Sequence, residues 1–112
     1  MHRNNLVHRD IKSENVVYSE TNTGSKRDFS KLQVKLVDFG FSRKSEHGSA
    51  ELVEFVGTPY YIAPEIVNSE EYGNKCDIWS LGVLVYEILS GEHPFTGKTR
   101  AELFRKITSG RF

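Results

Sequence analysis

Residues 8–15 read His-Arg-Asp-Ile-Lys-Ser-Glu-Asn, and residues 38–40 read Asp-Phe-Gly. The first stretch carries a carboxylate, Asp10, five residues before an amide, Asn15, and the second begins with another carboxylate, Asp38. Carboxylate and amide oxygens are hard ligands that suit Mg²⁺, which usually takes one or two protein carboxylates and completes its shell with phosphate and water. The two stretches therefore predict that Asn15 and Asp38 hold a magnesium ion.

Two short apolar runs lie between these stretches. Val16 to Tyr18 is β-branched and aromatic, and Leu32 to Val37 alternates apolar with polar residues, so both runs predict strands. Paired as a hairpin, the strands would bring Asn15 and Asp38 close together. The polar segment 19–31 is near the upper length, ~12 to 15 residues, of structureless connections in compact domains, and we interpret it as a surface insertion.

The composition predicts a folded chain without a strong overall charge. The 112 residues are 38% hydrophobic, and fifteen Lys and Arg balance fifteen Asp and Glu. Such a chain has no global field that would draw it to nucleic acid or to an anionic membrane. The longest apolar stretch, around residues 78–89, is shorter than the ~20 residues of a membrane span, and no signal-peptide run follows Met1. Together with the single cysteine, Cys76, this predicts a soluble intracellular protein, in the cytoplasm, without an internal disulfide.

The remaining segments predict a loop and two helices. Phe41 to Val56 has no clear period and is rich in Ser, Glu, Gly and Lys, which is typical of a mobile loop. Pro64 suits a first helical turn and begins a short helix through Val67. From Asp77 to Leu89 apolar residues cover nearly every face, which predicts a helix buried all round at the core of the structure.

A third helix is predicted after residue 99. Thr99 followed by Glu102 forms a capping-box pattern, and Gly110 suits the C-terminal end. The apolar stripe of this helix comprises Leu103, Phe104 and Ile107.

The order of these motifs resembles the eukaryotic protein kinases. The resemblance is carried by residues 8–15 and 38–40 and continues through Gly57-Thr58-Pro59, Ala63-Pro64-Glu65 and residues 77–82, Asp-Ile-Trp-Ser-Leu-Gly. It implies an α+β fold, a partial kinase large lobe over residues 1–112. The expected parts are the catalytic loop, a β-hairpin, the activation segment, the buried central helix and the helix after it. Residues 60–62, 77–83 and 94–95 together most resemble the calcium/calmodulin-dependent and calcium-dependent protein kinases.

The resemblance implies catalytic roles in transfer of the γ-phosphate of ATP to Ser or Thr hydroxyls of proteins. Asp10 would be the base that accepts the hydroxyl proton, and Lys12 would stabilise charge on the transferred phosphate. In the family, Lys at the position of Lys12 marks Ser/Thr specificity, and Thr58 helps to shape the acceptor site. Asn15 and Asp38 would hold Mg²⁺ with the ATP phosphates.

Other matching residues are expected to be structural. His8 and Phe39 resemble a stacked apolar column that connects the catalytic and metal-binding loops, and Gly40 completes the second motif. Asp77 resembles the helix residue that anchors the backbone of the catalytic loop. Glu65 resembles a residue that pairs with an arginine farther along the family's chain.

Regulation and substrate preference are also implied by the resemblance. In many kinases the residue at Arg9 binds a phosphate on the activation segment, and here the corresponding position is Glu54, so we expect a permanent carboxylate partner. Glu14 and Glu87 align with acidic residues that contact a basic residue near the target Ser or Thr, and Gly57 belongs to the same substrate-binding surface. Protein substrates with basic residues are the expected partners, with calmodulin or calcium-sensing regions as further partners of the full-length protein.

Simpler alternatives stay open at the level of the sequence. Taken singly, Asp10, Asn15 and Asp38 suit turn residues, and Arg9's proposed partner Glu54 suits a solvated loop charge. The sequence contains no Gly-rich loop or strand lysine for ATP, so this chain alone is expected to be inactive. A non-catalytic binding or regulatory module of kinase descent is therefore the main alternative, and an antibiotic-phosphotransferase-like enzyme is a third.

Overall fold

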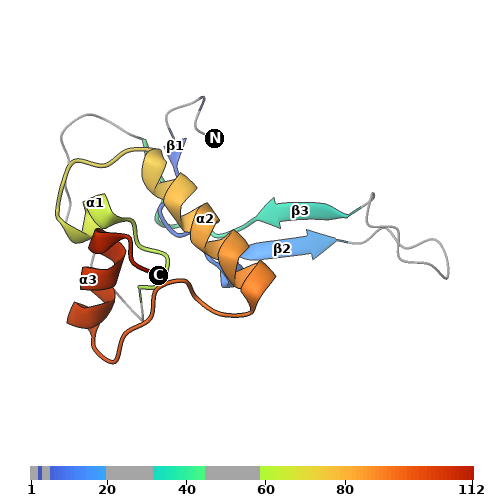
Figure 1. Cartoon of the computed structure of the whole chain (residues 1–112). Coiled ribbons are helices and arrows are strands. Elements are labelled where there is room, and N and C mark those ends of the chain that lie inside the picture. The colour runs from blue at the N-terminus through green and yellow to red at the C-terminus, as the bar shows by residue number, and fades with distance from the viewer. Residues whose placement is uncertain (1–2, 4–5, 20–31, 45–58) are drawn as a thin grey trace.

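The computed structural model describes residues 3, 6–19, 32–44 and 59–112. In chain order the elements are β1 (Leu6–Val7), a 3-10 helix η2 (Ser13–Asn15), β2 (Val16–Ser19), β3 (Gln33–Leu36), β4 (Arg43–Lys44), α1 (Pro64–Val67), α2 (Lys75–Ser90) and α3 (Arg100–Ser109). Figure 1 shows α1 and α3 grouped at one end, β2 and β3 projecting at the other, and α2 running between them. The predicted α+β class is confirmed.

The hairpin predicted on either side of the polar insertion is present. Strands β2 and β3 pair antiparallel, with Val16 opposite Leu36 and Ser19 opposite Gln33. Beyond the last pair, the Val37 backbone N–H donates to the Asn15 carbonyl at 2.9 Å, which extends the pairing toward the two motifs. Residues 20–31, most of the predicted insertion, lie outside the described residues.

A second, very short sheet corrects one prediction. The mobile loop predicted from Phe41 to Val56 contains a strand at its start, because β4 pairs antiparallel with β1, Leu6 opposite Lys44 and Val7 opposite Arg43. Two basic residues are too few to show a strand periodicity in the sequence, and the strand is defined by its pairing with β1. Residues 45–56 of the predicted loop lie outside the described residues.

The helices α1 and α3 match their predictions. Helix α1 has Pro64 in its first turn, where the missing N–H costs no intrahelical hydrogen bond. At α3 the Thr99 hydroxyl oxygen accepts a hydrogen bond from the Glu102 N–H at 3.1 Å, and the Glu102 carboxylate accepts from the Lys98 N–H at 3.0 Å. Gly110 ends the helix with φ of 65°, the left-handed conformation that glycine adopts without strain.

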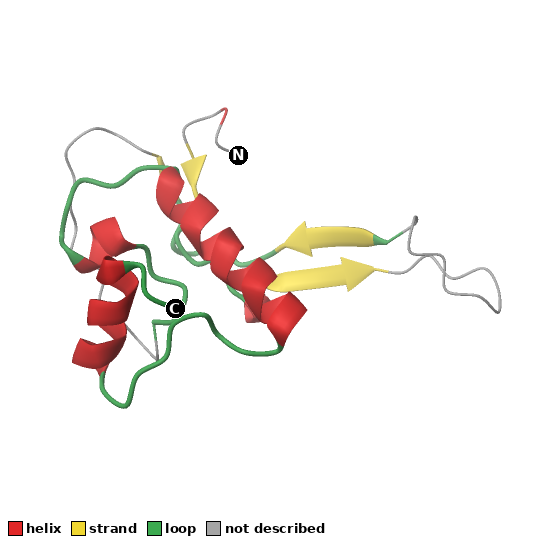
Figure 2. Ribbon diagram, in the orientation of Figure 1, coloured by secondary structure: helices red, strands yellow, loops and turns green. Residues whose placement is uncertain are grey.

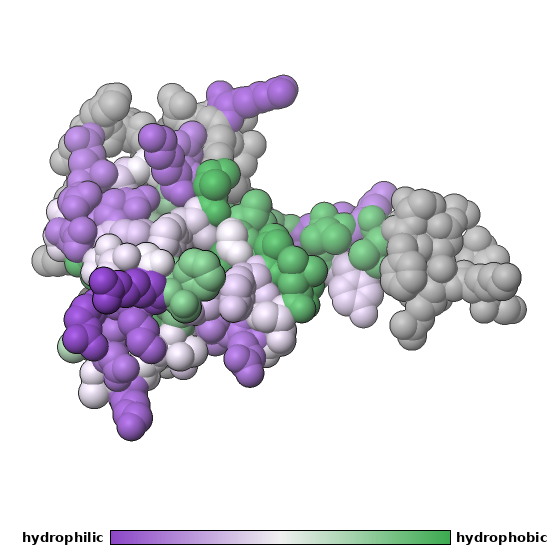
Figure 3. All heavy atoms as spheres, viewed as in Figure 1, coloured by the Kyte–Doolittle hydropathy of each residue, from purple (hydrophilic) through white to green (hydrophobic). Residues whose placement is uncertain are grey.

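Helix α2 is longer and less buried than predicted. It begins at Lys75 instead of Asp77, and its fully buried residues are Cys76, Asp77, Val83 and Leu84. Ile78 is 59% exposed and Leu89 is 82% exposed, so the prediction of a helix buried all round is wrong. The buried residues cluster on one side because the described neighbours pack there. Figure 3 shows apolar surface along α2 and onward over the hairpin.

Two hydrophobic clusters hold the helices together. The larger one contains Ile62, Val83, Phe95, Leu103 and Ile107, and the smaller one contains Val7, Ala63 and Cys76. Trp79 packs against both, with its ring stacked on Phe95 at a centroid distance of 5.6 Å. Each fully buried Leu or Ile stabilises the fold by about 1.5–3 kcal/mol. These contacts join the loop before α1 to α2 and α3. The ribbon in Figure 2 shows α1 and α3 next to one another. None of the helices in the described ranges is long and apolar enough to cross a membrane.

Candidate functional site

The backbone that leads into the site is held by a buried carboxylate. Asp77, in the first turn of α2, is 2% exposed, and its two oxygens accept hydrogen bonds from the backbone N–H groups of His8 and Arg9, each at 2.9 Å. Arg9 has a φ of 68°, an uncommon backbone conformation for a residue other than glycine. Charge-assisted hydrogen bonds of this kind compensate for burial of the carboxylate. The loop before Asp10 is thereby fixed on the N-terminal end of α2.

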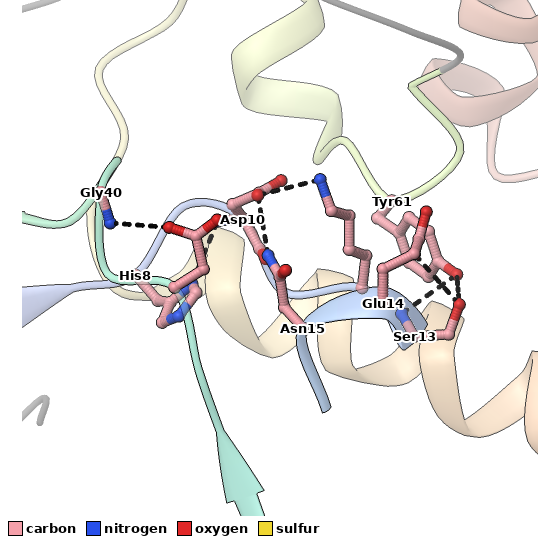
Figure 4. A network of polar contacts seen from close by, with 9 residues as sticks. His8, Asp10, Ser13, Glu14, Asn15, Gly40 and Tyr61 are labelled. Atoms are coloured by element: carbon pink, nitrogen blue, oxygen red, sulfur yellow. Dashed lines mark hydrogen bonds and ion pairs between the residues drawn. The ribbon is translucent and has the colours of Figure 1, made fainter. Parts of the chain in front are cut away.

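The central group is the Asp10 carboxylate. The Asn15 amide nitrogen donates to Asp10 Oδ2 and to the Asp10 backbone carbonyl, both at 2.8 Å. The Lys12 ammonium nitrogen lies 3.0 Å from the same Oδ2. Figure 4 shows the Asn15 and Asp10 side chains directed toward one another. Because both contacts fall on Oδ2, the other oxygen, Oδ1, is available to a further partner.

Asp38 lies beside Asn15 at the open end of the hairpin. Its φ is 61°, and its Oδ1 accepts a hydrogen bond from the Gly40 N–H at 3.1 Å. The pairing of Val37 with Asn15 places the backbones of the two predicted metal ligands at neighbouring positions. The hairpin thus brings residues 8–15 and residues 38–40 close together.

The His8 and Phe39 rings connect the same two segments. The ring centroids are 4.8 Å apart, with an edge-to-face angle of 62°. His8 is fully buried, and Phe39 is half-exposed. Edge-to-face aromatic pairs of this spacing are favourable, by about 0.5–1.5 kcal/mol beyond simple burial. The pair therefore holds the loop around Asp38 against the loop that carries Asp10.

The donor set fits a hard cation. Since the Asn15 amide nitrogen is engaged with two acceptors, its Oδ1 is the atom left to act as a ligand. Asp38 has one carboxylate oxygen bonded to the Gly40 N–H, so its second carboxylate oxygen is the atom left to act as a ligand. Within the described residues, no group of three or more His, Cys, Asp and Glu side chains could hold a metal ion. The available ligands are therefore one amide and one carboxylate oxygen, a set that Mg²⁺ accepts when phosphates complete its shell.

A second network joins the two acidic residues that were predicted to bind substrate. The Tyr61 hydroxyl donates to Glu87 at 2.5 Å, and the Ser13 hydroxyl lies 3.0 Å from Tyr61 and 3.1 Å from Glu14. Ser13 has one hydroxyl proton, so it bonds to one of these two neighbours at a time. Burial, and then the hydrogen bond to Glu87, raises the pKa of Tyr61 above its usual value, which keeps the phenol protonated as a donor. Figure 4 shows Ser13, Glu14 and Tyr61 together, apart from Asp10.

Sequence reasoning missed the bridging residues of this network. In the sequence, Tyr61 belongs to the family-like run 60–62, and Ser13 belongs to the first motif, residues 8–15. Neither is predicted to contact the other. The Ser13 to Tyr61 contact spans 48 residues, and no spacing in the sequence signals such a pair.

Arg9 connects three segments through its side chain. Its Nε donates to the Phe41 carbonyl at 2.7 Å, and its Nη1 donates to the Tyr72 hydroxyl at 3.0 Å. Both partners are neutral, so these contacts orient the guanidinium without cancelling its charge. Tyr72 is a second residue that sequence reasoning missed, because it lies 63 residues away in the loop before α2.

The other predicted site residues are distributed as follows. Glu65 lies in the first turn of α1 and is half-buried, with its backbone carbonyl accepting from the Glu70 N–H at 2.8 Å. Glu54, Gly57 and Thr58 lie outside the described residues.

Comparison with known proteins identifies the family. A family model described as "Protein kinase domain" matches residues 1–111. Calcium-dependent protein kinase 4 of Plasmodium berghei (strain Anka) is 41% identical over 100% of this chain and 20% of its own length. Serine/threonine-protein kinase 33 of Bos taurus is 38% identical over 98% of this chain and 23% of its own length. Putative serine/threonine-protein kinase A of Trypanosoma brucei brucei is 41% identical over 100% and 24%.

The chain thus spans about a fifth of the length of the first of these relatives and a quarter or less of the others. The resemblance stated from the sequence, to Ser/Thr protein kinases and within them to the calcium-dependent group, is confirmed by these matches. The family generally uses ATP and Mg²⁺, and the amide and carboxylate oxygens of Asn15 and Asp38 are of the type that Mg²⁺ prefers. Over nearly its whole length, this chain belongs to the protein kinase domain family.

Proposed function

We propose that the protein containing this chain transfers the γ-phosphate of ATP to Ser or Thr hydroxyls of protein substrates. The observation that carries the proposal is the Asp10 carboxylate, bound on one oxygen by Asn15 at 2.8 Å and by Lys12 at 3.0 Å. This arrangement orients a carboxylate beside a cation, as removal of a proton next to a phosphoryl group requires.

The proposed reaction assigns one task to each residue. Asp10 Oδ1 accepts the proton of the substrate hydroxyl, whose oxygen bonds to the γ-phosphorus while the bond to the leaving ADP oxygen breaks. Lys12 stabilises charge on the transferred group, and Thr58 shapes the acceptor position. Asn15 Oδ1 and Asp38 would hold Mg²⁺, which when bound offsets the negative charge of the phosphates.

The second network supports a proposed substrate preference. Glu14 and Glu87 carry two carboxylates near the same group of side chains, in which Tyr61 donates to Glu87 and the Ser13 hydroxyl bonds to either Glu14 or Tyr61. A Lys or Arg side chain near the target hydroxyl would form charge-assisted hydrogen bonds with them. We therefore propose basic protein substrates, with the Gly57 backbone contributing to the same surface. Glu87→Gln is expected to raise KM for a basic peptide several-fold while kcat changes little.

The proposed regulatory contact joins Arg9 to Glu54. The side-chain partners of Arg9 in the described residues, Phe41 and Tyr72, are neutral, which favours a further anionic partner. A carboxylate at Glu54 would supply it without phosphorylation. Glu54→Lys in the full-length enzyme is expected to lower kcat strongly, and unchanged catalysis would remove this part of the proposal.

The location and control of the full protein are further proposals. The single cysteine is a buried free thiol, which supports a location in the reducing environment of the cytoplasm. The name of the Plasmodium berghei relative, a calcium-dependent protein kinase, supports calcium control, exerted by parts of the full-length protein outside residues 1–112. Calmodulin or calcium-sensing regions are the partners that such control would involve.

The proposed activity is tested in the full-length protein by transfer of labelled phosphate to a basic Ser peptide. Asp10→Asn removes the proton acceptor but keeps the side-chain shape, and kcat is expected to fall about 10²- to 10⁴-fold. Glu92→Gln, at an exposed loop residue, is the matched control with the same chemical change and is expected to keep full activity. Full turnover by Asp10→Asn contradicts the proposed base. Absence of turnover in the unaltered protein, combined with retained peptide binding, favours the non-catalytic module instead.

A further inference from the structure

Tyr61 lies between residues 8–15 and α2, and several contacts hold it against α2. Its backbone carbonyl accepts a hydrogen bond from the Ser80 hydroxyl at 2.8 Å. Its ring stands edge-to-face against the His93 ring, with a centroid distance of 5.5 Å. Its hydroxyl donates to the Glu87 carboxylate. The Tyr61 side chain is therefore oriented with its single phenol proton directed at Glu87.

Two groups of Ser13 approach the same phenol oxygen. The Ser13 hydroxyl oxygen lies 3.0 Å from it, and the Ser13 backbone nitrogen lies 3.4 Å from it. Ser13 is the first residue of η2, where a backbone N–H has no acceptor within the helix. Because the phenol proton is given to Glu87, the Tyr61 oxygen is the acceptor in both contacts with Ser13.

The pKa of Tyr61 agrees with this assignment of donors and acceptors. Burial and the hydrogen bond to Glu87 raise the pKa, whereas the hydrogen bonds from the Ser13 side chain and backbone act to lower it. A donor to the phenol oxygen has this effect because it stabilises the phenolate form. Ser13 therefore acts on the Tyr61 oxygen as a donor.

The Ser13 hydroxyl has two alternative acceptors. It lies 3.1 Å from a Glu14 carboxylate oxygen as well as 3.0 Å from the Tyr61 oxygen, and Figure 4 shows all three side chains together. A basic side chain bound to Glu14 competes for that carboxylate, which favours donation of the Ser13 proton to Tyr61. Hydrogen bonds in a chain polarise one another, so this donation strengthens the bond from Tyr61 to Glu87. Ser13 thereby connects the two carboxylates.

We propose that Ser13 is a positioning residue for basic protein substrates, which acts on Glu87 through Tyr61. This inference rests on the proposed substrate preference at Glu14 and Glu87, and it adds the residue that links the two. Tyr61 bonds to Oε2 of Glu87, so Oε1 is the atom left for a Lys or Arg side chain of the substrate. Without the Ser13 hydroxyl, Tyr61 loses a donor to its phenol oxygen, and Glu87 is held less firmly for the incoming cation.

The test measures binding by fluorescence anisotropy, with the full-length protein and a dye-labelled peptide, Gly-Arg-Arg-Gly-Ser-Gly-Gly. The same peptide with Gln in place of Arg is the ligand control. Ser13→Ala is expected to weaken binding of the Arg peptide about two- to tenfold, the range that one hydrogen bond contributes. The Gln peptide carries no charge for Glu14 and Glu87, so its affinity is expected to stay within about twofold. In turnover assays Ser13→Ala is expected to raise KM for the Arg peptide more than it lowers kcat.

Three further variants separate a role through Tyr61 from a general effect on the loop. Ser13→Thr keeps the hydroxyl and is expected to bind the Arg peptide like the unaltered protein. Ser109→Ala is the matched control, because it removes an exposed hydroxyl that donates to the Lys106 carbonyl within α3, and it is expected to leave binding unchanged. In a Tyr61→Phe protein, adding Ser13→Ala is expected to cost less than about 1.5-fold, since residues that act through one another are not additive.

The outcomes distinguish this inference from the proposed activity. Unchanged affinity of Ser13→Ala for the Arg peptide overturns the inference, and so does an equal loss for the Gln peptide. The full loss in the Tyr61→Phe background also overturns it, because Ser13 would then act by another route. Equal affinity of the unaltered protein for both peptides contradicts the proposed substrate preference and the role of Ser13 with it. Absence of turnover by the unaltered protein contradicts the proposed activity, whereas the binding measurements still decide the role of Ser13.

Discussion

The contact of Asp77 with the loop backbone allows a quantitative prediction. In Asp77→Asn the side chain keeps its shape, but one of its two acceptor oxygens becomes an NH₂ group. In the unaltered protein the backbone N–H groups of His8 and Arg9 each lie 2.9 Å from an Asp77 carboxylate oxygen. In the variant one of these N–H groups faces the new NH₂ group, which is also a donor. The variant therefore loses a charge-assisted hydrogen bond and leaves a buried N–H without an acceptor.

The expected cost is that of one buried N–H group that loses its acceptor. A hydrogen bond to a charged group contributes about 1.5–3 kcal/mol, and the unsatisfied donor is part of this same loss, so the two are not added. Because the Asn oxygen still serves one of the two N–H groups, we expect a loss of about 2–3 kcal/mol in the free energy of opening this loop. At 1.4 kcal/mol for each tenfold change, the loop amides should exchange with solvent about 30- to 150-fold faster.

The assay is hydrogen–deuterium exchange of the peptide that contains His8 and Arg9, in the full-length protein. Local exchange is more informative here than a global transition, because several domains need not unfold in one step. Glu92→Gln serves as the matched control, because it makes an equivalent chemical change at an exposed residue. If Asp77→Asn accelerated exchange less than about threefold, or no more than the control, the carboxylate would not hold the loop as reasoned.

Four further predictions concern α3 and the core. Thr99→Ala removes the acceptor of the 3.1 Å hydrogen bond from the Glu102 N–H and should destabilise the first turn by about 1 kcal/mol, seen as faster exchange of that amide, whereas Thr99→Ser should not. Gly97→Ala would place a Cβ 2.6 Å from the Leu103 backbone nitrogen, so a loss of about 1–3 kcal/mol should lower the thermal midpoint, and an unchanged midpoint would refute the close approach. Burial raises the pKa of the Cys76 thiol to about 12, so iodoacetamide should label it at pH 8 only after unfolding in urea, as mass spectrometry of its peptide would show. Because this folded pKa lies above the ordinary value of 9.0, stability should be unaffected by the thiol below pH 9 and should fall as pH rises toward 12, and Cys76→Ala should abolish that part of the decline.

Local signals in the sequence were sufficient for several elements. The predicted hairpin formed because β-branched and alternating residues favour strands on both sides of a polar connection. Helix α3 formed between the residues expected to cap it, Thr99 and Gly110. Capping and proline rules succeed because they depend on hydrogen bonds within a few residues of the chain.

Burial of α2 was predicted poorly because it depends on contacts with elements distant in the sequence. The apolar side chain of Ile88 indicates that its burial would be favourable. It does not indicate which other element, if any, would cover it. In the structure Ile88 is 69% exposed while Val83, on the same helix, is 4% exposed. Which face is covered depends on the packing of separate elements, here the cluster formed with α3 and the loop before α1.

The sequence by itself determined the family, the order of the motifs and the residue types available for chemistry at Asp10, Asn15 and Asp38. Only the tertiary structure decided how Asp77 holds the loop and how Tyr61 joins Ser13 to Glu87. The physical reason is separation along the chain. Hydrogen bonds between residues tens of positions apart arise when packed helices bring them within about 3 Å, and no local periodicity encodes that distance.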